Sequence, residues 1–124
     1  MTEEDLLAYA RNKIGSVWAL EALILLHRDP GKSWGIDDLI RELRASEAVV
    51  AKSLIVLATE GLVDRDQPGR YAYRPRSAEA ATMADRLIRA YGERPIPVIE
   101  AIFSARDDKL QNLADAFLFR KPPT

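Results

Sequence analysis

The chain has 124 residues and 48% hydrophobic content, which is enough for one domain with a single core. Its 18 Lys and Arg residues against 19 Asp and Glu residues give a formal net charge of -1, so no global positive field draws the chain to nucleic acid or an anionic membrane. Any basic surface must therefore be local. The absence of cysteine excludes disulfides, thiolate metal sites and cysteine nucleophiles, and it fits a reducing compartment.

The first residues and the longest apolar run predict a soluble, cytoplasmic chain. Residues 1–5 include three acids, whereas a secretory signal begins with basic residues. The apolar run at 17–26 contains Glu21 and is far shorter than the roughly 20 residues that a helix needs to cross a bilayer. We therefore expect no membrane partner.

The N-terminal part of the chain predicts two helices. Thr2 is a favourable N-cap for a helix that ends near Lys13, and the acids that follow Thr2 suit the positive end of the helix dipole. Gly15 and Ser16 interrupt that helix and start the next one. Apolar residues then recur at helical spacing until residues 29–31 end the second helix.

The following segment predicts two helices joined by a tight turn. Trp34 lies in a turn or an isolated strand bridge, and we expect its side chain to pack. One helix runs from about Asp37 to Arg44. Ser46 then caps a third helix that reaches about Glu60.

A β-hairpin is predicted directly after this third helix. Gly61 ends the helix, and the segments 62–65 and 70–74 alternate with period two around a turn that contains Pro and Gly. The alternation places Arg70 and Arg74 on the face of their strand opposite its two tyrosines.

Three further helices complete the predicted elements. One runs from Ser77 to Gly92, a short one follows Pro97, and Asp107 caps the last one. Residues 120–124 are expected to fray. No repeat or linker divides the chain, so residues 1–124 are predicted to form a single domain.

Three consecutive segments carry the most specific pattern in the sequence. They are Ile36–Leu43 (IDDLIREL), Ser46–Leu54 (SEAVVAKSL) and Leu57–Arg65 (LATEGLVDR). The last of these requires a helix end, a glycine in a left-handed conformation and an immediate strand. Residues 16–76 resemble the winged helix-turn-helix domain of bacterial transcriptional regulators, most nearly the MarR-like group.

The resemblance implies a fold and a mode of binding. The fold is mainly α with a small β-hairpin, in which a winged helix-turn-helix core at 16–76 is flanked by helices at 1–15 and 77–119. In the family's DNA-binding members the third helix enters the major groove of double-stranded DNA, and the hairpin, or wing, touches backbone or minor groove. Carried over residue by residue, the candidate DNA contacts are Ser46, Ala48, Val49, Lys52 and Ser53 on the helix and Arg65, Arg70 and Arg74 on the wing, with Arg76 just beyond.

The wing is well suited to bind phosphates, whereas the third helix is poorly suited to read bases. The wing arginines form the densest basic segment of the chain, whereas no Arg, Asn or Gln lies between residues 46 and 60. Two interpretations stay open: modest specificity through methyl contacts and DNA shape, or an outward face that meets protein. At 100° per residue the inward set is Val50, Leu54 and Leu57 and the outward set is Ala48, Lys52, Ile55 and Thr59.

The flanking helices predict a homodimer. Their apolar stripes exceed what a 60-residue winged core needs to cover, and such helices form the dimer in MarR-like proteins. The alternative is that they pack onto the core of their own chain. The candidate dimerisation residues are Leu6, Leu7, Ala10, Leu87, Ile88, Tyr91, Ile99, Ile102, Phe103, Leu113 and Phe117.

Several conspicuous residues also have structural interpretations. The wing arginines could be solvated charges that protect a sheet edge. His27 is better explained as a helix-end or packed imidazole than as a metal ligand or catalytic residue. Trp18 and Trp34 are better explained as core or inter-helix anchors than as ligand contacts.

No constellation for catalysis is present in the sequence. A Ser-His-acid set, a phosphate loop, a Gly-rich nucleotide turn and a metal-spaced cluster are all missing, so we expect neither enzyme activity nor a cofactor. The predicted function is that of a homodimeric, DNA-binding transcriptional regulator. The alternative is a winged-helix module that holds another protein, such as one of the transcription machinery or of a phage, with little or no DNA binding.

Overall fold

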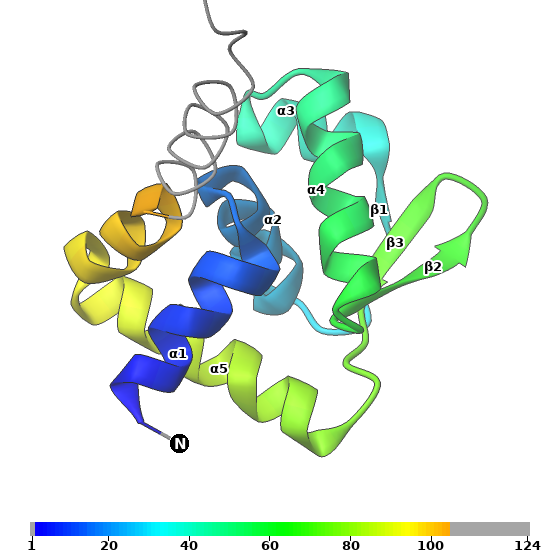
Figure 1. The fold of residues 1–124 in the computed structure, drawn as a ribbon. Helices are drawn as coiled ribbons and strands as arrows, with labels where there is room; N and C mark the ends of the chain where they lie inside the picture. Colours follow the sequence, from blue (N-terminus) through cyan, green and yellow to red (C-terminus); the bar gives the residue numbers. More distant parts are fainter. Residues whose placement is uncertain (1, 105–124) are drawn as a thin grey trace, which may run out of the picture.

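The computed structural model of the protein describes residues 2–104, which are mainly helical and include a small three-stranded antiparallel sheet (Figure 1). In this part of the chain, no helix combines the length and the apolar character that crossing a membrane requires. The elements are α1 (Glu3–Tyr9), the π-helical turn η1 (Ala10–Ile14), α2 (Val17–Arg28), β1 (Trp34–Gly35), α3 (Ile36–Leu43), α4 (Glu47–Thr59), β2 (Val63–Gln67), β3 (Arg70–Tyr73), α5 (Ala78–Glu93) and a helical segment at 95–104.

The predicted caps of the first two helices are confirmed. The Thr2 hydroxyl accepts a hydrogen bond from the Asp5 N–H at 3.1 Å, and the Asp5 carboxylate accepts one from the Thr2 N–H at 3.0 Å. Gly15 adopts a left-handed conformation with φ 70°, and the Ser16 hydroxyl accepts from the Ala19 N–H at 2.9 Å. The chain therefore ends one helical stretch and begins α2 within two residues.

The tight turn between α3 and α4 is also confirmed. Arg44 ends α3 in a left-handed conformation with φ 55°, and the Ser46 hydroxyl caps α4 by accepting from the Val49 N–H at 3.2 Å. These two residues set the direction in which α4 leaves α3.

The sheet has the strand order β1-β3-β2, so the short β1 covers the outer edge of the hairpin strand β3. Trp34 pairs with Tyr71 in β3, and its side chain is buried as predicted. Gly61, at φ 71°, provides the predicted exit from α4. The strands leave only Pro68 and Gly69 between them, so the connection is shorter than the predicted turn.

Helix α5 begins as predicted but ends one residue later. The Ser77 hydroxyl caps it by accepting from the Ala80 N–H at 3.0 Å. The helix runs through Gly92 to Glu93, so the predicted stop at Gly92 is wrong. The end follows from Pro95, because the residue before a proline is disfavoured in the helical region and Arg94 accordingly has φ -143° and ψ 77°.

One cluster of buried side chains connects the flanking helices to the central ones. Ala10, Leu87 and Ile102 are at most 1% exposed within this cluster. The prediction that these three lie in a dimer interface is therefore wrong, because their side chains already pack inside their own chain. Leu6, Leu7, Ile88, Tyr91 and Ile99 are half-buried, and Phe103 is exposed.

Two polar contacts fasten α5 to α2. Tyr91 donates from its hydroxyl to Glu21 Oε1 at 2.8 Å, a hydrogen bond that, together with burial, raises the pKa of Tyr91. His27 Nε2 lies 2.7 Å from Asp85 Oδ1, and its ring meets Tyr73 edge-on at 4.9 Å between centroids. His27 thus packs at the end of α2, as expected. The predicted helix at Asp107, with Leu113 and Phe117, and the predicted tail at 120–124 lie outside the described residues.

Candidate nucleic-acid interface

Helix α4 presents one face to solvent and the other to the core. Val50, Leu54 and Leu57 are at most 2% exposed, and Ile55 is 66% exposed. The inward and outward sets predicted from the helical period are confirmed in full, because Ala48, Lys52 and Thr59 are also exposed.

The five residues of α4 that were predicted to contact DNA do not all reach the outside. Ser46, Ala48 and Lys52 are exposed, and Val49 is half-buried. Ser53 is only 3% exposed and donates its hydroxyl hydrogen to the Val49 carbonyl at 2.8 Å. Its placement as a DNA contact is therefore wrong: it stands on the inward side, and its donor is satisfied by the backbone.

Arg70 is occupied by contacts within the chain. Its Nε donates to Ser33 Oγ and its Nη2 donates to the Ser33 carbonyl oxygen, both at 2.9 Å. These bonds fasten β3 to the loop that precedes β1. The guanidinium thus supports the sheet instead of standing free for a ligand.

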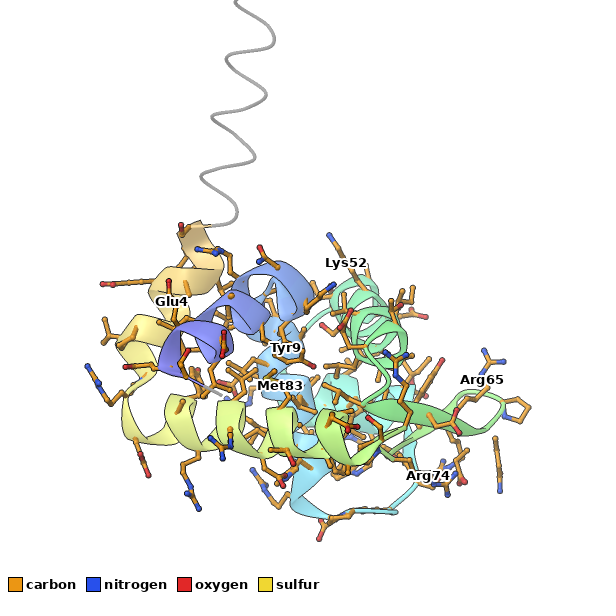
Figure 2. The ribbon with its side chains drawn as sticks, turned by 60° about the horizontal axis from the view of Figure 1, so that its bottom comes forward. Glu4, Tyr9, Lys52, Arg65, Arg74 and Met83 are labelled. Carbon is orange, nitrogen blue, oxygen red and sulfur yellow. The ribbon has the colours of Figure 1, made fainter. Side chains whose placement is uncertain are left out.

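Arg74 is occupied as well. Its Nη2 donates to Asp66 Oδ1 at 2.7 Å, and this hydrogen bond is the main reason why the pKa of Asp66 is lowered. Arg65 pairs with Tyr71 in the hairpin register, so strand alternation places it on the face opposite Arg70 and Arg74. Figure 2 shows Arg65 and Arg74 on different sides of the hairpin.

Arg76 lies away from the tip of the hairpin. Its N–H donates to the Gly61 carbonyl at 2.8 Å, and its side chain occupies the space where a Cβ on Gly61 would stand. The four arginines that are close in sequence therefore do not form a single basic patch on the hairpin.

A different group of basic residues gathers beside α4. Arg11 and Lys13 of η1 and Lys52 of α4 line a hollow of about 380 Å³ between η1, the start of α2 and α4. We call it the η1 hollow. No aspartate or glutamate lines it, and none of the three cations forms an ion pair within residues 2–104. Figure 2 shows Lys52 projecting from α4, with the N-terminal helical segment on one side and the hairpin on the other.

Apolar side chains form part of the wall of the η1 hollow. Val49 and Val56 contribute from α4, and Trp18 contributes from α2. Trp34 is 7% exposed, so its interpretation as a core anchor is confirmed, whereas Trp18 is 44% exposed and does not belong to the buried core. The hollow thus combines positive charge with an accessible aromatic surface.

The surface between α3 and the hairpin turn has the opposite character. Three acids, Asp37, Asp38 and Glu47, line a depression there together with Arg41 and Arg70. Arg41 Nη2 donates to Asp38 Oδ1 at 3.1 Å, and Arg70 is bound to Ser33. The acids on this side of α4 outnumber the cations, so it repels anions more than the η1 hollow does.

The sequence interpretation missed Arg11 and Lys13. They lie more than 30 residues before α4, on a segment that was assigned to dimerisation. Both precede the Gly15 break, but their position beside Lys52 depends on the packing of η1 against α4, which the sequence pattern does not show.

No protein-family model, curated protein or solved structure matches the chain.

Proposed function

We propose that residues 16–76 form a winged helix-turn-helix that binds double-stranded DNA through α4, and that the protein is a transcriptional regulator. The order α2, β1, α3, α4, β2, β3 and the three-residue turn between α3 and α4 support this proposal. The hairpin that follows Gly61 would be the wing.

The observation that carries the proposal is the uncovered face of α4. Ala48, Lys52 and Ile55 are exposed along it, and Lys52 stands at the edge of the η1 hollow. The major groove of B-DNA admits an α-helix, and the groove walls then bring phosphates to both flanks of that helix. Methyl groups of Ala48 and Ile55 suit contacts with thymine methyls, so sequence reading would be modest.

We further propose that the protein acts as a homodimer. Ile96 and Phe103 on the 95–104 segment are 60% and 47% exposed, which leaves apolar surface for a second copy. A two-fold pair would present two α4 helices to half-sites about one DNA turn apart. Sedimentation should give a dimer at tens of micromolar for the unaltered chain and a monomer for Phe103→Ser. A monomeric unaltered chain at that concentration contradicts this part of the proposal.

The DNA-binding proposal is tested with fragments of the genome that encodes the protein, by mobility shift at low salt. Lys52→Gln should weaken binding about tenfold, the effect of losing one charged contact. Lys32→Gln is the matched control, because it removes the same charge from a residue that lies 4.0 Å over the Trp34 ring in another part of the chain. If no fragment is retarded, or if the two variants behave alike, the proposal is wrong.

The exposure of Ile55 and Trp18 favours a second function, a module that binds another protein. These are two of the four large hydrophobic side chains that are exposed among residues 2–104. A partner recovered in equal stoichiometry without DNA, and lost on Ile55→Ser, would support this function over DNA binding.

A further inference from the structure

Two cations of the η1 hollow, Arg11 and Lys13, have no role in the DNA-binding mode that the winged-helix resemblance implies. We infer that this hollow, and not the hairpin, holds the phosphates of the DNA backbone beside α4. The inference rests on the proposed function and specifies which residues of that interface supply the electrostatic attraction.

The charge of the η1 hollow is the first argument. Three cations and no acid line it, in a chain whose formal net charge is -1. Affinity for duplex DNA depends largely on cations that replace the counterions of the phosphates. Within residues 2–104, Arg11, Lys13 and Lys52 have no acidic partner that a phosphate would first have to displace.

The engagement of Arg70 and Arg74 within the chain is the second argument. Binding of a phosphate by Arg74 would break its 2.7 Å contact with Asp66, and binding by Arg70 would break two bonds to Ser33. The acids on that flank, Asp37 and Glu47 among them, would also approach the backbone. A duplex therefore gains less from this flank of α4 than from the η1 flank.

The geometry of η1 is the third argument. The Gly15 N–H donates to the Ala10 carbonyl at 2.8 Å, a bond that spans five residues and widens the last turn. The consecutive residues Arg11, Asn12 and Lys13 all line the same hollow. The amide of Asn12 adds a neutral hydrogen-bonding group beside the two cations.

The position of Lys52 links the hollow to the base-reading face. Lys52 is exposed on the outward side of α4 and also lines the hollow. A helix seated in the major groove has a phosphate strand on each flank. Seating α4 therefore brings one of these strands over Arg11 and Lys13.

The test compares salt dependence of binding to a 24-base-pair duplex of mixed sequence, measured by fluorescence anisotropy. Arg11→Gln/Lys13→Gln should weaken binding. It should also reduce the steepness of the fall of log K with log salt by about two, since each lost phosphate contact reduces that slope by about one. Arg86→Gln/Arg89→Gln removes the same net charge from exposed positions of α5 and should leave the slope unchanged. Arg74→Gln should also leave it unchanged.

Two further measurements separate the possible failures. Arg11→Lys/Lys13→Arg keeps both charges and should retain the slope, which distinguishes lost charge from lost folding. If the unaltered chain binds the duplex and Arg11→Gln/Lys13→Gln keeps its slope, or if Arg74→Gln lowers the slope as much, the inference alone is wrong. If the unaltered chain binds no duplex, the proposed function and the inference are both wrong.

Discussion

The β2–β3 hairpin and the η1 hollow use basic residues in opposite ways. The hairpin and the residues just after it have four arginines within a dozen positions, but Arg70 and Arg74 are bound to Ser33 and Asp66. The hollow takes its cations from two separate segments, and none has an acidic partner within the described residues. Basic residues that are close together in the sequence thus need not be available to a ligand, and basic residues from separate segments can form an available surface.

This difference divides the two regions by role. Hydrogen bonds from a charged group to the backbone and to a hydroxyl contribute to stability, whereas surface cations that form no such bonds contribute little to it. We therefore expect Arg70 and Arg74 to affect folding and the hollow cations to affect binding.

The largest expected effect on the free energy of unfolding comes from Arg70→Ala. The substitution removes both bonds to Ser33 and should lower the free energy of unfolding by about 2 kcal/mol. Arg11→Ala is the matched control, because Arg11 is also a half-buried arginine and should change stability by less than about 0.5 kcal/mol. Urea unfolding monitored by circular dichroism measures both values.

A double-mutant cycle sharpens this prediction. Ser33→Ala removes the hydroxyl acceptor, so its cost and that of Arg70→Ala should not be additive. Additive costs, or an equal loss in Arg11→Ala, would show that Arg70 does not fasten the sheet.

Much of the local structure could be predicted from the sequence. Thr2, Ser16, Ser46 and Ser77 cap helices because a short polar side chain precedes each apolar run, and these signals are local. The inward face of α4 follows from its period in the same way. The end of α5 was missed because Gly92 resembles a stop, although Pro95 sets the boundary.

The candidate site could be predicted only in part. The outward position of Lys52 follows from helix geometry. The hydrogen bond from Arg70 to Ser33, in contrast, joins residues 37 positions apart, which a local sequence pattern does not reveal. The packing of η1 beside α4 is equally non-local. Sequence periodicity contains no information on such contacts, and the winged-helix resemblance placed the phosphate contacts mainly on the hairpin.

A smaller effect on stability is expected at alkaline pH, from Tyr9 at the end of α1. Burial, with the nearby Glu60 carboxylate adding to it, raises the pKa of Tyr9 to about 12. The folded state thus holds the proton more tightly than the unfolded state, so stability is complete below about pH 10 and falls as pH rises toward 12. The melting temperature of the unaltered chain should decrease between pH 10 and 12 more steeply than that of Tyr9→Phe. Parallel curves would indicate that the phenol is well solvated and that the end of α1 packs loosely.

The smallest expected effect is at acid pH and concerns the hairpin. The hydrogen bond from Arg74 lowers the pKa of Asp66, so the folded state favours the carboxylate. Stability from this group is present above the unfolded pKa of about 4 and is lost as pH falls through that value toward the folded pKa. Urea unfolding between pH 5 and 2.5 should show a weaker acid dependence for Asp66→Asn than for the unaltered chain. Asp64→Asn, which removes an exposed acid of the same strand that forms no ion pair within residues 2–104, should retain the dependence. Equal curves for the two variants would mean that Arg74 is not held by Asp66 in solution, and the hairpin would then compete with the η1 hollow for phosphate.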